Sequence, residues 1–368
     1  MATKERSLEN AIKTKLNERE AKEFNRIYYG REEHCELELK ESTLTTCDKE
    51  NIDVQAYKFY GATEEARKPR LTKIGLVQHS IVLPTDKPIK DQQEAIFQKV
   101  KNIIDIAASE GVQLLCLQET WSMPFFLCTQ QKSPWISFTE SAESGPSVMF
   151  LRKLAAKYDM VIISPILEIE EGVWWNTVVV IGESGNIIGK HRKNHLPSAP
   201  GSSCETPFYS PGNTGHPVFE TKYGRIAINI CYGRHHALNW LMFRLNNAEI
   251  VFNPCATLAN FGEPFWHAEA RNAAIANGYF TCCLNRVGKE HFIINTEDGD
   301  NVVDRSYFGS GYISAPDGTR TPSLSTVRDG LLITVVDLNL CRQTRDRWGF
   351  IMTSRLDDYA KELKEYVK

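Results

Sequence analysis

Three polar residues stand at or just beyond the ends of short apolar runs, and their types could support nucleophilic catalysis. They are Glu119, Lys193 and Cys231. A thiol can attack a carbon atom, a carboxylate can accept the thiol proton, and an ammonium group can stabilise the anion that forms. Taken singly, each residue also has a structural explanation: a solvated loop acid, a basic surface, or a small buried hydrophobic residue.

Cys231 lies in the most specific local pattern of the three. Residues 226–230 predict a strand, Gly233 marks a tight turn, and residues 237–245 have the apolar spacing of a helix. A transition from strand to turn to helix exposes a nucleophile and directs the helix N-terminal amides toward it, which stabilises a thiolate and a developing oxyanion. The pattern therefore favours Cys231 as the nucleophile among the ten cysteines.

The elements that would position these residues alternate in type along the chain. From residue 73 onward, short apolar runs alternate with amphipathic helices, which predicts β and α elements interleaved in one sandwich-like domain. Residues 1–70 are charge-rich with loosely helical apolar spacing, and they predict a helical arm outside the core. Strands are expected at residues 74–78, 112–117, 160–164, 175–181, 187–190, 225–230, 250–252, 279–284, 311–314 and 331–336, and helices at 92–110, 146–158, 237–245 and 264–277.

The composition limits the class of protein. Lys plus Arg is 43 and Asp plus Glu is 46, and the resulting net charge of −3 argues against a basic nucleic-acid surface. Because no apolar run is long enough for a membrane span and none follows the charged start, we expect neither membrane insertion nor secretion. Ten irregularly placed cysteines then indicate thiols in a reducing, cytoplasmic compartment. The cysteine and histidine spacing makes no tetrahedral site, so we expect no metal.

Several motifs together resemble the nitrilase, or carbon–nitrogen hydrolase, superfamily. The most specific is Asn229-Ile230-Cys231-Tyr232-Gly233-Arg234-His235-His236, and the others lie at residues 118–121, 191–195, 269–277, 285–288 and 337–343. The resemblance covers nearly the whole chain and implies an α/β fold, the nitrilase-type α-β-β-α sandwich with a helical N-terminal arm. It also implies a homo-oligomer, with residues 71–339 as the hydrolase domain. The arm at 1–70 and the tail at 340–368 would contribute to assembly.

The same resemblance implies a role for each of the three polar residues. Cys231 would be the nucleophile, Glu119 the general base, and Lys193 would stabilise the tetrahedral oxyanion together with the backbone amide of Tyr232. Water activated by Glu119 would then release the acyl group from sulfur. These roles agree with the chemistry of the residue types alone.

Three further residues receive less specific roles. Glu205 is the plausible counterpart of a further catalytic carboxylate of the superfamily, which would hold Lys193 and the substrate amide; a solvated loop acid is the alternative. Arg234 and His235 directly follow the turn and could bind an anionic substrate tail through charge-assisted hydrogen bonds. The alternative for Arg234 and His235 is a structural ion pair at a helix start.

The implied reaction is hydrolysis of N-carbamoyl-β-alanine, or a close ureido acid, to β-alanine, carbon dioxide and ammonia, as in pyrimidine degradation and without a cofactor. However, residues 198–205 lack an arginine, an aspartate and a phenylalanine of the usual pattern, and residues 289–305 are changed. Gln130 replaces an arginine and Cys255 a serine. Loss of a cation weakens the binding of a substrate carboxylate, because a charge-assisted hydrogen bond is worth about 1.5–3 kcal/mol. An amidase or carbamoylase with a switched substrate is therefore an alternative. A catalytically silent binding paralog is another, which the intact catalytic residues oppose.

Overall fold

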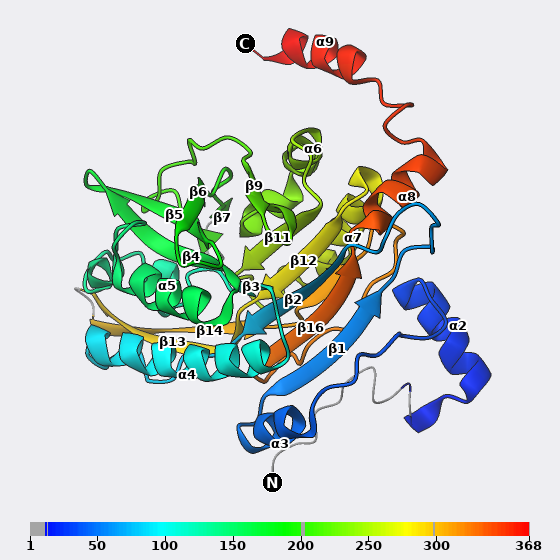
Figure 1. The fold of residues 1–368 in the computed structure, drawn as a ribbon. Coiled ribbons are helices and arrows are strands. Elements are labelled where there is room, and N and C mark those ends of the chain that lie inside the picture. Colours follow the sequence, from blue (N-terminus) through cyan, green and yellow to red (C-terminus); the bar gives the residue numbers. More distant parts are fainter. Residues whose placement is uncertain (1–11, 13, 200–202, 297–298, 368) are drawn as a thin grey trace.

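The computed structural model describes residues 12, 14–199, 203–296 and 299–367, and two of its sheets stack face to face (Figure 1). The larger sheet has seven strands in the order β1-β16-β2-β3-β4-β5-β6. β2, β3 and β4 are parallel, whereas β4, β5 and β6 form an antiparallel meander. The strands are β1 (Asp53–Phe59), β2 (Leu71–Gln78), β3 (Leu114–Leu117), β4 (Val161–Glu170), β5 (Val173–Ile181), β6 (Ile187–Arg192) and β16 (Gly330–Asp337).

The smaller sheet has five strands in the order β15-β12-β11-β10-β9. Its three central strands are parallel, and each edge strand is antiparallel to its neighbour. The strands are β9 (Val218–Thr221), β10 (Gly224–Ile228), β11 (Ile250–Cys255), β12 (Phe280–Asn285) and β15 (Tyr312–Ser314). Both sheets therefore have parallel central strands, and the carboxyl ends of such strands are where loops can present functional side chains.

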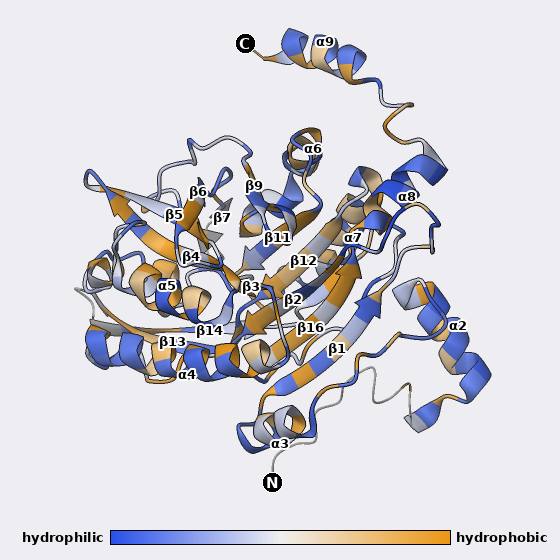
Figure 2. Ribbon diagram, viewed as in Figure 1, coloured by the Kyte–Doolittle hydropathy of each residue, from blue (hydrophilic) through white to orange (hydrophobic). Residues whose placement is uncertain are grey.

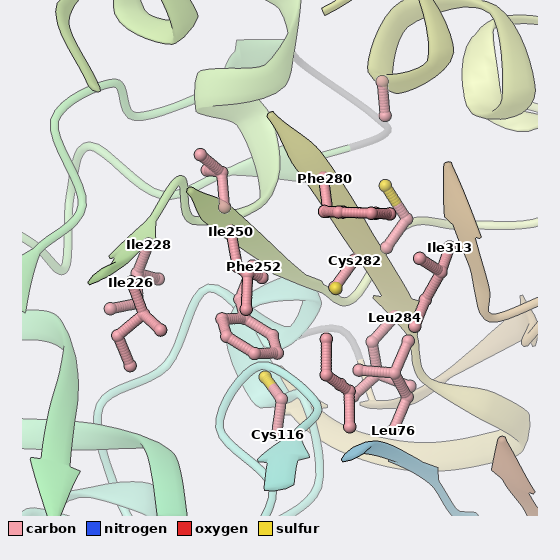
Figure 3. Packing of buried hydrophobic residues seen from close by; sticks show 14 of the residues in the cluster. Leu76, Cys116, Ile226, Ile228, Ile250, Phe252, Phe280, Cys282, Leu284 and Ile313 are labelled. Atoms are coloured by element: carbon pink, nitrogen blue, oxygen red, sulfur yellow. The ribbon is translucent and has the colours of Figure 1, made fainter. Parts of the chain in front are cut away.

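Alternate residues of the larger sheet face two different cores, as the two-residue period of a strand requires. In β3, Leu114 and Cys116 pack toward the smaller sheet, whereas Leu115 and Leu117 pack toward helices on the opposite face. Figure 3 shows Cys116 beneath Phe252 in the layer between the sheets. The flanking helices are α4 (Ile89–Ser109) and α5 (Pro146–Tyr158) on the larger sheet, and α6 (Ala237–Leu245) and α7 (Glu263–Asn277) on the smaller one. The predicted α-β-β-α sandwich is confirmed.

The N-terminal segment contains helices, as the sequence predicts, but it also supplies a strand. Helix α2 (Glu18–Tyr29) begins with a capping box formed by Asn17 and Glu20, and helix α3 (Glu41–Lys49) follows. β1 then pairs in parallel with β16 at the edge of the larger sheet. The side chain of Ala56 is buried in the core between this sheet and its flanking helices. The sequence analysis missed this strand because charged and polar residues interrupt its few apolar ones. Residues 1–11 and 13 lie outside the described residues.

A second unexpected element is the antiparallel ribbon of β13 (Val287–Thr296) and β14 (Gly299–Phe308). The sequence analysis assigns no strand to residues 289–305, whereas the structure places most of them in this ribbon. Phe292 is buried among aromatic side chains, but Ile293 and Val302 are exposed. The other altered segment contains only the two-residue strands β7 (Ser198–Ala199) and β8 (Ser203–Cys204), and residues 200–202 lie outside the description.

The C-terminal segment extends away from the sandwich (Figure 1). Helix α8 (Asn339–Trp348) packs onto the body through residues such as Leu340 and Cys341. Helix α9 (Leu356–Tyr366) has no buried residue, although hydrophobic and hydrophilic residues alternate along it (Figure 2). Within the described ranges, none of the helices has the length and apolar character that a membrane crossing requires.

Candidate active site

Cys231 is the first residue of a short 3₁₀ turn, Cys231–His235, that joins β10 to α6. Its backbone has φ +40°, which is unfavourable for a residue with a side chain and is typical of functional sites. A Cβ atom on Gly233 would lie 2.3 Å from Oδ1 of Asn229, so the tightness of the turn requires glycine. The sequence predicts a strand, a turn and a helix here, and the structure adds the 3₁₀ turn between them.

Asparagine side chains hold this turn in place. Nδ2 of Asn239 donates to Oδ1 of Asn229 at 2.7 Å, and Nδ2 of Asn253 donates to the backbone carbonyls of Asn229 and, at 3.4 Å, of Cys231. These contacts join β10, β11 and α6. The strained conformation of Cys231 is therefore fixed by buried hydrogen bonds on both sides of it.

Glu119, Lys193 and Glu205 form a buried cluster. Nζ of Lys193 donates to Oε1 of Glu119 at 2.9 Å and to Oε1 and Oε2 of Glu205 at 2.8 and 2.7 Å. Glu119 follows β3, Lys193 follows β6, and Glu205 follows β8, so three separate segments converge. An ammonium group has three N–H donors, and here it faces three carboxylate oxygens. The structure thus brings together the residues that the sequence analysis selected from distant motifs.

The cluster has two carboxylates for one cation, and the pKa values respond to this imbalance. Burial is the main reason why the pKa of Glu205 is raised to about 7, with the charge of Glu119 acting in the same direction and Lys193 against it. Burial also acts to lower the pKa of Lys193, but the charges of Glu119 and Glu205 raise it well above its usual value. Lys193 is therefore a fixed cation, whereas Glu205 can take a proton near neutral pH.

Cys231 is a neutral thiol at rest. A hydrogen bond with Cys255, burial, and the charge of Glu119 raise its pKa well above the usual value, and Lys193 acts in the opposite direction. Oγ1 of Thr257 lies 3.9 Å from its sulfur. Because the thiol proton is firmly held, nucleophilic attack requires a base, and Glu119 is the carboxylate that acts electrostatically on this sulfur.

Two residues that the sequence analysis missed hold Glu119. Nδ2 of Asn176 donates to Oε1 of Glu119 at 2.7 Å. Nη2 of Arg286 donates to the backbone carbonyls of Glu119 and Thr120 at 3.1 and 2.9 Å, and Nη1 pairs with Glu290 at 2.7 Å. The available signal for Asn176 is that it and Thr177 are the polar residues of a strand that is otherwise apolar. Arg286 lies within one of the motifs, at residues 285–288, but without an assigned role.

Arg234 contacts helix α7 in the structure. Its Nε donates to Glu269 at 2.8 Å, its Nη2 donates to the carbonyls of Phe265 and Trp266, and its guanidinium lies 4.2 Å from the centre of the Trp266 ring. All of these partners belong to α7. The structure therefore places Arg234 in a buried structural ion pair, which was the alternative interpretation.

His235 and Tyr232 lie on the more accessible side of the turn. Nδ1 of His235 is hydrogen-bonded to Glu269 at 2.6 Å, while 31% of its side chain remains exposed. The ring of Tyr232 packs edge-on against His235 and His236. His235 is thus the member of the predicted pair that has a solvent-accessible surface for a ligand.

Two of the altered positions are close to the cluster. Cys255 contacts Cys231 directly, and Nε2 of Gln130 donates to the carbonyl of Cys204, the residue before Glu205.

In the described part of the chain, no group of three His, Cys, Asp or Glu side chains is arranged to hold a metal ion. The side chains of the site are a thiol, two carboxylates and an ammonium group.

Comparisons with known proteins identify relatives of similar sequence. The chain is 51% identical to beta-ureidopropionase of Arabidopsis thaliana over 372 residues, covering 98% of this chain and 90% of the relative. It is 25% identical to N-carbamoylputrescine amidase of Solanum lycopersicum, covering 80% of this chain and 95% of that protein.

The fold matches solved structures as well. The carbon-nitrogen hydrolase from Helicobacter pylori superposes with a TM-score of 0.67 at 22% identity, covering 80% of this chain and 99% of that one. The family model described as carbon-nitrogen hydrolase matches residues 73–346, which include Glu119, Lys193, Glu205 and Cys231. The chain therefore belongs to the carbon–nitrogen hydrolase family.

Proposed function

We propose that this protein hydrolyses N-carbamoyl-β-alanine, or a close ureido acid, to β-alanine, carbon dioxide and ammonia. The observation that carries the proposal is the buried Glu119–Lys193–Glu205 cluster beside a thiol with a strained backbone. The 51% identity to a beta-ureidopropionase, over almost the whole chain, supports this choice of substrate.

In this mechanism, Glu119 accepts the proton of Cys231 and the sulfur attacks the ureido carbonyl carbon. Lys193 and the backbone amide of Tyr232 stabilise the tetrahedral oxyanion, and Glu119 returns the proton to the departing ammonia. Water, activated by Glu119, then attacks the thioester-like carbonyl and frees the sulfur. The N-carboxy amino acid that leaves breaks down to carbon dioxide and β-alanine, so one water is consumed in all.

Glu205 has a supporting part in this scheme. In the resting state all three donors of Lys193 face carboxylate oxygens, so an oxyanion must displace one of them. A proton on Glu205 weakens its attraction for Lys193, and its raised pKa, about 7, makes that protonation accessible near neutral pH. We therefore propose that Glu205 controls how strongly Lys193 is held.

The direct test is release of ammonia and β-alanine from N-carbamoyl-β-alanine by the purified protein, with Cys231→Ala as the control. We expect turnover that disappears in the variant, because no other described thiol occupies the turn. Hydrolysis that persists in Cys231→Ala would exclude this cysteine as the nucleophile. Absence of turnover in both proteins would exclude this substrate.

One observation favours a second candidate, an amidase or carbamoylase acting on a different substrate. Nε and Nη2 of the Arg234 guanidinium are bound to Glu269 and to backbone carbonyls of α7, which leaves only Nη1 for a substrate carboxylate. A profile of ureido acids, uncharged amides and N-carbamoyl amines separates the two candidates. Equal turnover of ureido acids and unrelated amides would favour the second. Absence of turnover with every substrate of this profile would instead favour a silent binding protein.

We further propose that the protein assembles as a homo-oligomer in which residues 340–368 contribute to the interface. Helix α9 buries none of its residues within this chain, and Met352 and Tyr366 are 90% and 82% exposed. Exposed apolar side chains on an extended segment are typical of a surface that a partner covers. Light scattering over a range of concentrations tests the proposal, which a monomer at every concentration would contradict.

A further inference from the structure

The two carboxylate oxygens of Glu119 have very different surroundings. Oε1 accepts hydrogen bonds from Nδ2 of Asn176 at 2.7 Å and from Nζ of Lys193 at 2.9 Å. Oε2 is buried and has no hydrogen-bond partner among the residues that the structure describes. A buried oxygen without a partner costs folding free energy, so its presence in a native protein calls for an explanation such as a catalytic role.

Asn176 is connected to both members of the base–cation pair. It lies in β5, opposite Leu167 of β4, and its side chain is buried. Its amide donates to Glu119, and its backbone carbonyl accepts the N–H of Lys193 at 2.9 Å. One residue of the sheet therefore fixes where the carboxylate and the ammonium group lie relative to each other.

The orientation of the Glu119 carboxylate depends on this amide. The guanidinium of Arg286 holds the backbone carbonyls of Glu119 and Thr120, so the remaining freedom is rotation of the carboxylate about its own side-chain bonds. Lys193 alone could serve either oxygen, because an ammonium group is a compact charge with freely rotating donors. Asn176 adds a second, directional donor at Oε1.

We infer that Asn176 is a positioning residue for the catalytic base, and that Oε2 of Glu119 is the atom that takes the proton of Cys231. The inference rests on the proposed function, because it takes Glu119 as the base. With both donors on Oε1, the lone pairs of Oε2 are the ones that remain available. An uncharged amide also holds the carboxylate without adding a second cation to the site.

The first test compares Asn176→Ala with the wild-type protein. We expect kcat for N-carbamoyl-β-alanine to fall roughly 10- to 100-fold with KM little changed, since misplacing a catalytic group affects the chemical step. We also expect iodoacetamide to label Cys231 more slowly by about the same factor. Peptide mass spectrometry measures this labelling rate. The labelling needs no substrate.

Asn339→Ala is the matched control for this test. Asn339 is also a buried asparagine, and its Nδ2 donates to the carbonyl of Lys68 at 2.8 Å, a contact that involves neither Glu119 nor the turn Cys231–His235. Wild-type kcat and labelling are expected in the control. The same loss in both variants would indicate a general effect of removing a buried asparagine, and would overturn the positioning role.

Asn176→Asp separates positioning from a merely structural role. This variant is nearly isosteric, and its carboxyl group can donate to Oε1 of Glu119 only when protonated. We therefore expect its labelling rate relative to wild type to fall as pH rises, whereas Asn176→Ala is slow at every pH. A lowered thermal midpoint without this pH dependence would point to a structural residue and overturn the inference.

The outcomes distinguish the inference from the function on which it rests. Wild-type labelling and kcat in folded Asn176→Ala would overturn the positioning role, whatever the substrate. Slower labelling of Cys231, together with no hydrolysis of N-carbamoyl-β-alanine by the wild-type protein, would reject the substrate and still support the role of Asn176.

Discussion

Arg192 and Lys193 are neighbours in sequence at the end of β6, yet they belong to two different ionic networks. Arg192 binds Glu168 through two parallel hydrogen bonds of 2.9 Å and also pairs with Glu170 at 2.6 Å. Lys193 binds Glu119 and Glu205. Both networks join a cation after or within β6 to carboxylates from other segments, and both have buried members. They differ in charge balance and in how completely their oxygens are used.

The Arg192 network is balanced and saturated. Lys190 adds a second cation, which pairs with Glu168 at 2.6 Å and with Glu170 at 3.0 Å, and Oγ1 of Thr177 donates to Glu168 at 2.6 Å. Burial acts to raise the pKa of Glu168, but the hydrogen bonds from Arg192, Lys190 and Thr177 lower it below its usual value. The network therefore keeps its charges and takes part in no proton transfer near neutral pH.

The Lys193 cluster is unbalanced and incomplete. It has one cation for two carboxylates, the pKa of Glu205 is raised to about 7 chiefly by burial, and Oε2 of Glu119 has no partner among the described residues. Satisfied, balanced ion pairs are suited to holding strands together, whereas an unsatisfied carboxylate and a shifted pKa are suited to proton transfer. Both networks have buried members, so burial does not distinguish a structural ion pair from a site of proton transfer. The balance of charges and hydrogen bonds does distinguish them.

The largest effect is expected from Lys193→Met. Removing the only cation leaves two carboxylates buried together, which costs about 3–5 kcal/mol of unfolding free energy at neutral pH. One of them then takes a proton in the folded state, so its folded pKa lies above its unfolded value and the stability of the variant increases as pH falls. Turnover is expected to drop to background. Urea unfolding at neutral and mildly acidic pH, with an activity assay, measures both effects.

Arg192→Met is the matched variant in the balanced network. Glu168 keeps Lys190 and Thr177 as partners, so we expect a smaller loss of about 1.5–3 kcal/mol, which is the value of hydrogen bonds to a charged group. Turnover per folded molecule should remain. If Arg192→Met abolished turnover as Lys193→Met does, the two networks would act as one and the comparison would fail.

An intermediate effect is expected from Glu205→Gln, and it concerns pH. The folded pKa of Glu205 is about 7, above its usual 4.5, so this group binds more protons in the folded protein between these pH values. Its contribution to stability is complete below the lower value and is lost as pH rises through the higher one, at up to about 1.4 kcal/mol per pH unit. Glu205→Gln should remove this slope. If the unfolding free energies of the wild-type protein and of Glu205→Gln decreased equally as pH rises, Glu205 would not be the titrating group.

The residues of the candidate site could be selected from the sequence because each lies beside a distinctive local pattern. Cys231 ends a strand that runs into a glycine turn, and Glu119 and Lys193 lie within motifs that resemble those of the family. Their convergence depends on pairing between distant strands, which the motifs imply only through the fold. The strands β5 and β6 and the helices α4 to α7 were likewise predicted from local sequence patterns, whereas the α-β-β-α sandwich was implied by the resemblance to the family.

What could not be predicted depends on partners that lie far away in the sequence. Arg234 has the same local context whether it binds a substrate or Glu269, and only the packing of α7 decides between these alternatives. Nothing in the local sequence links Asn176 to Glu119, because their contact forms only in the folded sheet. β1 has weak apolar alternation, and pairing with β16 determines its conformation. Long-range contacts therefore override local preference at these positions.

The smallest effect is expected from Glu170→Gln, at the exposed edge of the balanced network. Hydrogen bonds from Arg192 and Lys190 lower the pKa of Glu170 to about 2, but 52% of its side chain is exposed and solvent screens the pair. The loss should be about 0.5 kcal/mol or less at neutral pH and should shrink further in high salt. Because its folded pKa is depressed, its contribution is present above the usual value of 4.5 and is lost as pH falls, which is the opposite direction to Glu205. Urea unfolding of Glu170→Gln at low and high salt measures the difference, and a loss as large as that of Arg192→Met would show that the exposed carboxylate, rather than buried Glu168, is the main partner of Arg192.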